Sequence, residues 1–317
     1  MTTRQPLAAL LRKTGYKLVS FADRLVPSAA SAPQQSRFLR FFYPGHYYSP
    51  LPDPDYVDAH GARLFNRQID SLPGIDDNWP GQERLFKEFL KYSPEYTPAE
   101  SAEAARTAGN RYYTDNTFFS YLDAFSYYGM LRHYRPKNIV EVGSGFTSAL
   151  ALDVAEKFLR PPPRFTFIEP FPERLRQLLR PEDFNNTTTH ESFVQEMPPD
   201  VFLALAAGDI LFIDSSHVSK IGSDVNFLYL EILPRLAPGV IIHIHDVFWP
   251  FEYPKAWLDE GRCWNELYLL RGMLAGTKRY RILLFNSQIA GNHPELIKEL
   301  PSWASPKYAQ SIWLEVV

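Results

Sequence analysis

From residue 138 to its end, the chain repeats one pattern: a short apolar run, then a longer stretch in which apolar residues recur every three or four positions. The short runs predict strands, and the periodic stretches between them predict helices. Strands are expected at residues 139–142, 164–168, 187–190, 209–213, 240–244, 280–285 and 311–316. Strands that alternate with helices predict an α/β fold built on a mostly parallel sheet.

A helix is also predicted just before the first strand. It is expected to begin near Asn116, with Phe118, Leu122 and Phe125 on a single buried face. This helix leads directly into the first strand. Tyr113, Asn116 and Asp123, on and just before it, are minor ligand-side candidates and are more often structural.

The stretch after the fourth strand predicts a helix with Ile221, Val225 and Leu228 on its buried face. Pro234 is expected to kink or end that helix, because proline has no backbone N–H to donate. After the fifth strand, residues 247–254 combine aromatic side chains with prolines, which predicts a stiff apolar wall.

The first 112 residues follow a different pattern. Residues 7–25 predict an amphipathic helix that packs on its own domain, with a membrane surface or a partner as the alternative. A linker is expected at 27–36, and the proline- and tyrosine-rich residues 38–80 are expected to be ordered but irregular. We therefore divide the chain into an extension, residues 1–112, which is expected to form a cap, and an α/β domain, residues 113–317.

Residues 138–148, NIVEVGSGFTS, place a glycine-rich turn between the first strand and a helix. Such a turn lets a ligand approach the backbone, and the following helix offers unpaired N–H groups. As a dinucleotide fingerprint the turn is incomplete, because Thr147 stands where a third glycine is expected. Glu141, two residues before the first glycine, suits a cationic ligand better than a pyrophosphate.

The sequence Glu141-Val-Gly143-Ser-Gly145, followed by Thr147-Ser148, resembles the first motif of class I S-adenosylmethionine-dependent methyltransferases. The resemblance continues to the C-terminus. It implies a Rossmann-like, seven-stranded sheet with an antiparallel last strand and helices on both faces, and S-adenosylmethionine as the cofactor. It also implies cofactor contacts from the turn, namely Glu141, Gly143, Ser144, Gly145, Thr147 and Ser148.

Two further positions are expected to contact that cofactor. Glu169 ends the second strand at close to the spacing of about 20 residues at which an acid binds ribose hydroxyls in nucleotide folds. A carboxylate there can accept two hydroxyl hydrogen bonds. In the family the adenine ring lies near the turn after the third strand, which implies contacts from Ser192 and Phe193.

Four titratable side chains follow the fourth and fifth strands: Asp214, His217, His245 and Asp246. In open parallel sheets, ligands bind outside the carboxyl ends of the strands, so these residues are expected in one crevice. The spacing Asp214-x-x-His217 resembles a pattern in some sugar and macrolide O-methyltransferases. It implies that His217 is a general base and that Asp214 binds the ligand or a metal. His245 and Asp246 are further catalytic candidates.

Whether the site needs a metal is left open by the same residues. Metal-dependent members of the family carry Asp-Asp or Asp-Asn after the fifth strand, whereas this chain carries His245-Asp246. A requirement for Mg²⁺ is therefore doubtful, because Mg²⁺ prefers oxygen ligands. His243, inside the strand, is expected to be a hydrogen-bonded core residue.

Composition adds limits on partners and compartment. The net charge of −3 gives no electrostatic reason to expect nucleic acid as a partner. The single cysteine excludes an internal disulfide and suits a reducing, cytoplasmic compartment. No apolar run reaches the roughly 18 residues that a membrane span needs.

The leading hypothesis is methylation of a hydroxyl group on a small molecule or sugar. The alternatives are a nucleotide-dependent (NAD-type) oxidoreductase on a Rossmann sheet and a non-catalytic protein that binds S-adenosylmethionine. Glu141 and the missing third glycine disfavour the oxidoreductase. The sequence makes no prediction of an oligomeric state.

Overall fold

The structure is a computed structural model that describes all residues except 1–41, 43–44, 66–68, 70 and 308. The predicted helix at 7–25 and linker at 27–36 lie outside the described residues. The chain divides into two compact units, Met1–Asn66 and Arg67–Val317.

The first unit contains helix α2 (Pro54–Phe65). The expectation of an irregular segment across residues 38–80 is therefore wrong for these residues. Pro54 is the first residue of the helix, where a missing N–H and a φ fixed near −65° are tolerated. No further proline follows it until Pro73, so nothing interrupts the helix.

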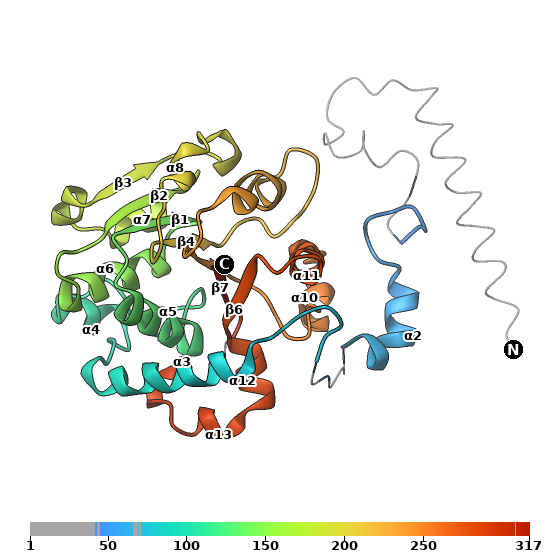
Figure 1. The fold of residues 1–317 in the computed structure, drawn as a ribbon, viewed down its shortest axis with the longest axis horizontal. Coiled ribbons are helices and arrows are strands. Elements are labelled where there is room, and N and C mark those ends of the chain that lie inside the picture. Colours follow the sequence, from blue (N-terminus) through green and yellow to red (C-terminus); the bar gives the residue numbers. More distant parts are fainter. Residues whose placement is uncertain (1–41, 43–44, 66–68, 70, 308) are drawn as a thin grey trace, which may run out of the picture. The chain divides into compact units, whose positions relative to one another are not determined.

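The second unit is built on a seven-stranded sheet with the order β3-β2-β1-β4-β5-β7-β6 (Figure 1). Strands β1 to β5 pair in parallel, and β7 runs antiparallel to both β5 and β6. The strands are β1 (Asn138–Val142), β2 (Arg164–Ile168), β3 (Thr187–His190), β4 (Ile210–Ile213), β5 (Ile241–Ile244), β6 (Tyr280–Phe285) and β7 (Ile312–Val316). The predicted Rossmann-like fold is confirmed, and each predicted strand agrees within one residue.

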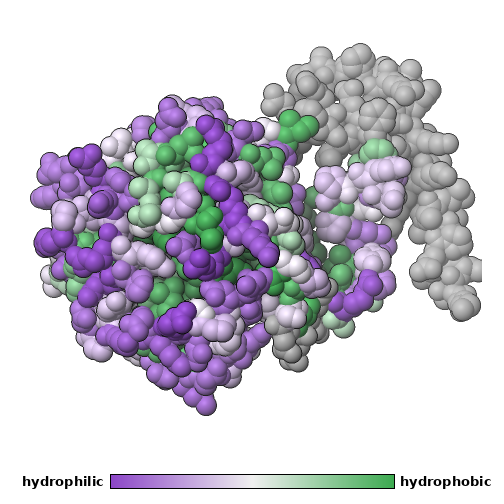
Figure 2. All heavy atoms as spheres, viewed as in Figure 1, coloured by the Kyte–Doolittle hydropathy of each residue, from purple (hydrophilic) through white to green (hydrophobic). Residues whose placement is uncertain are grey.

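Helices cover both faces of this sheet. They are α3 (Trp79–Tyr92), α4 (Ala102–Thr107), α5 (Tyr121–Tyr134), α6 (Phe146–Phe158), α7 (Glu173–Leu178), α8 (Asp200–Leu203), α9 (Asp224–Asn226), α10 (Lys255–Asp259), α11 (Glu266–Gly276), α12 (Asn286–Asn292) and α13 (Pro294–Ile297). Among the described residues, no helix is both long and apolar enough to cross a bilayer. Hydrophilic side chains cover much of the visible surface of this unit (Figure 2).

Two hydrophobic clusters fill the space between the sheet and its helices. Helices α3, α5 and α6 pack on one face of the sheet, and Ile139 of β1 belongs to the cluster on that face. Helix α11 and the segment after β4 pack on the other face, and Val140, the residue after Ile139, belongs to the cluster there. Successive strand residues point to opposite faces, so strands covered on both sides read as continuous apolar runs. The continuous apolar runs of these buried strands are the reason that the sequence predicted them.

Helix α5 begins at Tyr121, five residues later than the Asn116 start predicted from periodicity. The side-chain oxygen of Asn116 accepts the backbone N–H of Phe118 (3.1 Å) and of Phe119 (2.8 Å), which holds a turn in place of a first helical turn. Leu122 is fully buried as predicted, but Phe118 is 52% exposed.

The helical segment after β4 ends at Ile232, as predicted from Pro234, but it is not a regular α-helix. Residues Phe227–Ile232 form a π-helix, and Leu233–Arg235 form a single 3₁₀ turn. Pro234 cannot donate an N–H and its ring clashes with the carbonyl four residues earlier, so a regular α-helix is not possible here. Val225 is buried as predicted, whereas Ile221 is fully exposed.

Residues 67–112 of the predicted extension lie in the same unit as the sheet. Helix α3 packs on α5 and β6. Arg111 donates hydrogen bonds to Asp153 (2.8 Å) and Glu156 (2.7 Å) on α6 and pairs with Asp183. The boundary at residue 112 and a cap formed by the extension remain predictions.

Candidate active site

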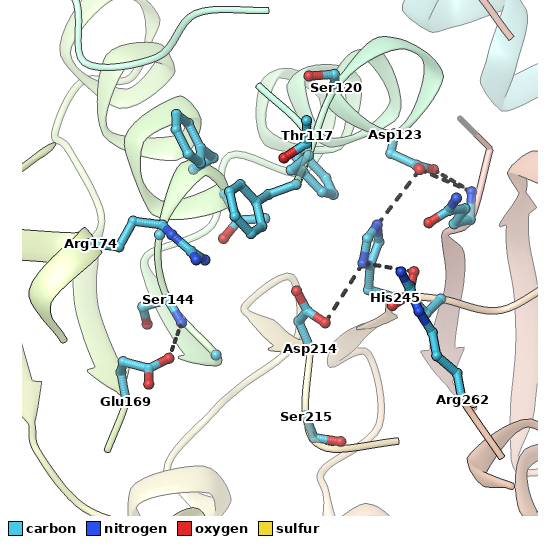
Figure 3. A pocket seen from close by; sticks show the side chains of 18 of the residues that line it. Thr117, Ser120, Asp123, Ser144, Glu169, Arg174, Asp214, Ser215, His245 and Arg262 are labelled. Atoms are coloured by element: carbon cyan, nitrogen blue, oxygen red, sulfur yellow. Dashed lines mark hydrogen bonds and ion pairs between the residues drawn. The ribbon is translucent and has the colours of Figure 1, made fainter. Parts of the chain in front are cut away.

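A pocket of about 680 Å³ lies at the carboxyl ends of β1, β2, β4 and β5 (Figure 3). This is where ligands bind in open α/β sheets, beside the point at which the strand order reverses between β1 and β4. Its volume is within the usual range of about 300–1,000 Å³ for small-molecule sites. The predicted site residues on its wall are Gly143, Ser144, Gly145, Thr147, Glu169, Asp214, His245 and Asp246.

The glycine turn after β1 is pressed against the end of β4. Gly143 has a φ of +80°, in the left-handed region, and a Cβ at this position would lie 1.9 Å from the carbonyl oxygen of Asp214. A side chain cannot fit there without moving backbone. The turn therefore has glycine because two strand ends meet behind the pocket floor.

Glu141 lies behind this turn and is fully buried. It accepts hydrogen bonds from the hydroxyls of Ser148 (2.8 Å) and Thr147, and the Ser148 hydroxyl accepts the N–H of Gly145 (3.0 Å). Burial raises the pKa of Glu141 to about 8, although the two hydroxyls lower it. Glu141 and Ser148 are not on the pocket wall, so they support the turn from behind.

Glu169 lies at the end of β2 with its carboxylate beside the turn. Its two oxygens accept the backbone N–H groups of Ser144 (3.1 Å) and Phe171 (2.9 Å). These bonds fix the carboxylate at the pocket wall and leave further lone pairs for a ligand. Ser192 and Phe193 are not on the wall. The Phe193 ring is 48% exposed and stands edge-on to Phe171.

His217 is 4% exposed and lies behind the pocket wall. Its Nδ1 is 2.8 Å from Oε2 of Glu266, a buried residue at the start of α11. Its Nε2 is 3.3 Å from Oδ1 of Asp214 and 3.3 Å from Oδ2 of Asp246. The imidazole therefore joins the two strand-end carboxylates to α11.

The three groups at this junction have displaced pKa values. Burial would lower the pKa of His217, but the hydrogen bonds to Asp214 and Glu266 outweigh it and raise the pKa to about 10. Burial would raise the pKa of Asp214, but the charge of His245 and the hydrogen bond to His217 hold it below its usual range. Burial raises the pKa of Asp246. At neutral pH, His217 is thus a cation between two carboxyl groups.

His245 faces the pocket from the end of β5. Its Nδ1 is 3.4 Å from Oδ1 of Asp246, and its Nε2 is 3.7 Å from Oδ2 of Asp123 (Figure 3). Burial would lower its pKa, but the charges of Asp246 and Asp214 raise it well above the usual value. His243 is fully buried and bonded to Ser311 (2.9 Å), so the predicted core role is confirmed.

Sequence reasoning missed the far wall of the pocket. The Arg174 guanidinium lies 3.6 Å from the ring centroid of Phe118, and Arg262 lies 4.6 Å from that of Trp257. All four line the pocket. No local pattern could reveal the first pair, because Arg174 and Phe118 come from different elements and Phe118 was assigned to a buried helix face.

The side chains of Asp214, His217 and Asp246 can also hold a metal ion. Among the described residues, each offers one ligand atom, and these atoms all lie within 4.8 Å of one another. Two carboxylate oxygens and one imidazole nitrogen form a donor set that fits a divalent cation.

Comparison with known proteins agrees with this geometry. Residues 140–247 match the family model of a methyltransferase domain. Residues 140–247, about a third of the chain, are therefore similar to a methyltransferase domain. The match spans the glycine turn, Glu169, and the ends of β4 and β5, so the predicted family is confirmed over the part of the chain that forms the pocket.

Individual relatives of the methyltransferase domain are distant or partial. An uncharacterised protein of Archaeoglobus fulgidus is 36% identical over 134 residues, which are 42% of this chain and 60% of that protein. The SAH-bound methyltransferase PaMTH1 of Podospora anserina is 14% identical with a TM-score of 0.41, over 92% of this chain and 99% of that one. The O-methyltransferase TomG of Streptomyces achromogenes, in complex with SAM, is 14% identical with a TM-score of 0.38, over 83% of this chain and 96% of that one.

Proposed function

We propose that this protein transfers a methyl group from S-adenosylmethionine to a hydroxyl oxygen of a small molecule or sugar. The observation that carries the proposal is one continuous pocket, whose wall runs from Glu169 and the glycine turn to His245 and Asp246. The first half has the strand-end carboxylate and open backbone that suit a nucleoside with ribose hydroxyls. The second half has the titratable groups that an acceptor hydroxyl needs.

The reaction is an in-line displacement. The acceptor oxygen attacks the methyl carbon, the carbon–sulfur bond breaks with its electron pair moving to sulfur, and the hydroxyl proton passes to a base. The main contribution of the protein is to hold oxygen and methyl carbon in line. The turn from Gly143 to Gly145 brings backbone within reach of the cofactor, and the aromatic Trp257 offers a ring on which an acceptor can stack.

Asp246 is the proposed proton acceptor. It lies on the pocket wall, and burial raises its pKa while the pKa of neighbouring Asp214 is held low. Two carboxyl groups with pKa values pushed apart are typical of an acid–base pair with distinct roles. His217, predicted as the base, acts in this proposal through Asp246, because it lies behind the wall and carries its own proton. His245 holds the other oxygen of Asp246.

A divalent cation is a compatible second cofactor. Asp214, His217 and Asp246 would hold it, since their ligand atoms already converge. Such an ion lowers the pKa of a bound hydroxyl.

The proposal is tested by calorimetric titration of S-adenosylmethionine and S-adenosylhomocysteine into the wild type, Glu169→Ala and Glu173→Ala. Glu173 is an exposed carboxylate near Glu169 that does not line the pocket, so its variant is the matched control. We expect Glu169→Ala to weaken binding by about 1–3 kcal/mol, because buried hydrogen-bond partners lose their acceptor. The control should bind like the wild type.

Transfer itself is measured with methyl-labelled S-adenosylmethionine and a panel of phenols, sugars and hydroxylated small molecules. Asp246→Asn should lose transfer while keeping cofactor binding, because the amide cannot accept the proton. A wild type that binds neither cofactor form would overturn the proposal. Binding of NAD(H) in its place would favour an oxidoreductase.

A further inference from the structure

The position of His217 is fixed from several sides at once. Its carbonyl oxygen accepts the backbone N–H groups of Asn265 (3.1 Å) and Glu266 (3.1 Å) at the start of α11. Its ring packs on Trp264, with centroids 4.3 Å apart. The carboxylate of Glu266, itself 1% exposed, bonds to Nδ1 at 2.8 Å. Backbone, ring face and ring edge of His217 all have partners.

The contact with Glu266 also determines which ring nitrogen faces the strand ends. An ionised carboxylate only accepts hydrogen bonds, so Nδ1 of His217 carries the hydrogen that points at Glu266. The second nitrogen, Nε2, then points at the gap between Asp214 and Asp246, 3.3 Å from each. A metal ion bound in that gap would displace the proton that Nε2 carries in the metal-free protein. A buried carboxylate behind an imidazole whose other nitrogen faces further ligands is the usual arrangement around protein-bound metals.

From this geometry we propose that His217, positioned by Glu266, is a metal ligand and makes the site prefer a first-row transition-metal ion such as Mn²⁺ over Mg²⁺. The inference rests on the proposed function, because it concerns the cation that the methyl-transfer site takes. Imidazole nitrogen suits transition metals, whereas Mg²⁺ is usually bound by carboxylates, water and other oxygens.

Among the described residues, the two other buried carboxylates nearest this junction, Asp123 and Glu266, already have partners. Asp123 is turned to Asn286 (2.7 Å) and to the backbone N–H of Gln310 (2.9 Å). Glu266 lies on the far side of the imidazole from the pocket-wall carboxylates. Of the carboxylates around the junction that the structure describes, only Asp214 and Asp246 belong to the converging set, so His217 supplies its third ligand.

The test is a titration of Mn²⁺ into the protein, followed through the electron paramagnetic resonance signal of the free ion, and a competition with Mg²⁺. The variants are Glu266→Gln, His217→Asp and, as a control, Glu252→Gln. Glu252 accepts hydrogen bonds from the backbone N–H of Tyr253 (3.2 Å) and from the Tyr268 hydroxyl, and it neither lines the pocket nor contacts His217 in a hydrogen bond or ion pair. Thermal melting of each variant shows whether it is folded.

We expect the wild type to bind Mn²⁺ at least about tenfold more tightly than Mg²⁺. Glu266→Gln should lose about 10–100-fold in Mn²⁺ affinity, the usual cost of removing a partner that orients a ligand. His217→Asp, which makes an all-oxygen set, should narrow the Mn²⁺ to Mg²⁺ preference without abolishing Mg²⁺ binding. The Glu252→Gln control should behave like the wild type.

Three results would overturn the inference: no Mn²⁺ binding by the wild type, equal affinities for Mn²⁺ and Mg²⁺, or unchanged Mn²⁺ affinity in Glu266→Gln. If that variant does not fold, His217→Asp decides, because an unchanged metal preference there also refutes the role of the imidazole. A parallel S-adenosylhomocysteine titration separates the two claims. If the protein does not bind S-adenosylhomocysteine but shows the expected Mn²⁺ and Mg²⁺ affinities, only the proposed function is rejected.

Discussion

Replacing Gly143 by alanine tests the central geometric feature of the site. Two costs add at this position. A left-handed residue with a Cβ costs about 1–2 kcal/mol, and the φ of Gly143 is +80°. The new Cβ would also lie 1.9 Å from the Asp214 carbonyl oxygen, which is backbone and cannot rotate away. Overpacking of this kind typically costs a further 1–3 kcal/mol, so we expect a loss of about 2–5 kcal/mol in the free energy of unfolding.

The same substitution should abolish ligand binding. To admit the Cβ, the end of β4 must move away from the turn, and the Asp214 side chain moves with it. Asp214 holds Nε2 of His217 at 3.3 Å, so its displacement breaks the junction behind the pocket. We therefore expect no measurable S-adenosylhomocysteine binding by calorimetry, even where the variant is folded.

Two other glycines separate these effects. Gly109 has a φ of +64° and nothing within 4 Å of a built Cβ, so Gly109→Ala should show only the conformational cost. At Gly145 a Cβ would meet Cδ of Arg174 at 3.2 Å, a flexible side chain, so Gly145→Ala should lose little stability. Urea unfolding followed by tryptophan fluorescence measures all three. If Gly143→Ala is no less stable than Gly109→Ala, the clash with β4 is not real.

Two further predictions concern buried charge. Burial raises the pKa of Glu141 from 4.5 to about 8, so between these pH values the folded state keeps a proton that the unfolded state loses. The free energy of unfolding should therefore fall by about 1.4 kcal/mol for each unit by which the pH rises across this range. Glu141→Gln should remove that slope in urea unfolding from pH 5 to 8; an equal slope in both proteins would contradict it. Arg111→Met should cost about 3–5 kcal/mol, because Asp153 and Asp183 stay buried without their cation. Lys87→Met, at an exposed pair, should change stability little in the same assay, and equal losses in the two variants would refute the reasoning.

The sheet could be predicted because each strand carries its own signal. The strands between two helix layers, such as Ile210–Ile213, are buried on both faces and so are continuously apolar. The turn after β1 has its signal in the glycines, and the strand-end positions of Asp214 and Asp246 follow once the strands are placed. These are local patterns, and in the fold the residues that carry them lie around one pocket.

What the sequence could not give depends on contacts between distant segments. The side chain of Asn116 bonds to the backbone ahead of α5, which delays the helix and releases Phe118 to the pocket wall. Periodicity counts apolar positions and does not register that competition. Glu266 reads as an ordinary first-turn acid of α11, and only the fold brings it to His217, 49 positions away in sequence.

The group of ionisable side chains at the ends of β4 and β5 is hard to explain as a stabilising feature. Replacing buried ion networks by apolar residues is often neutral or stabilising, because desolvation offsets the attraction between the charges. The backbone is costly here too, since His217 and Asp246 have φ values of 60° and 57°, each worth about 1–2 kcal/mol for a residue with a Cβ. A domain under selection for stability alone would not place buried charges and left-handed residues together. Their coincidence at the pocket is explained if the arrangement is retained for the chemistry performed there.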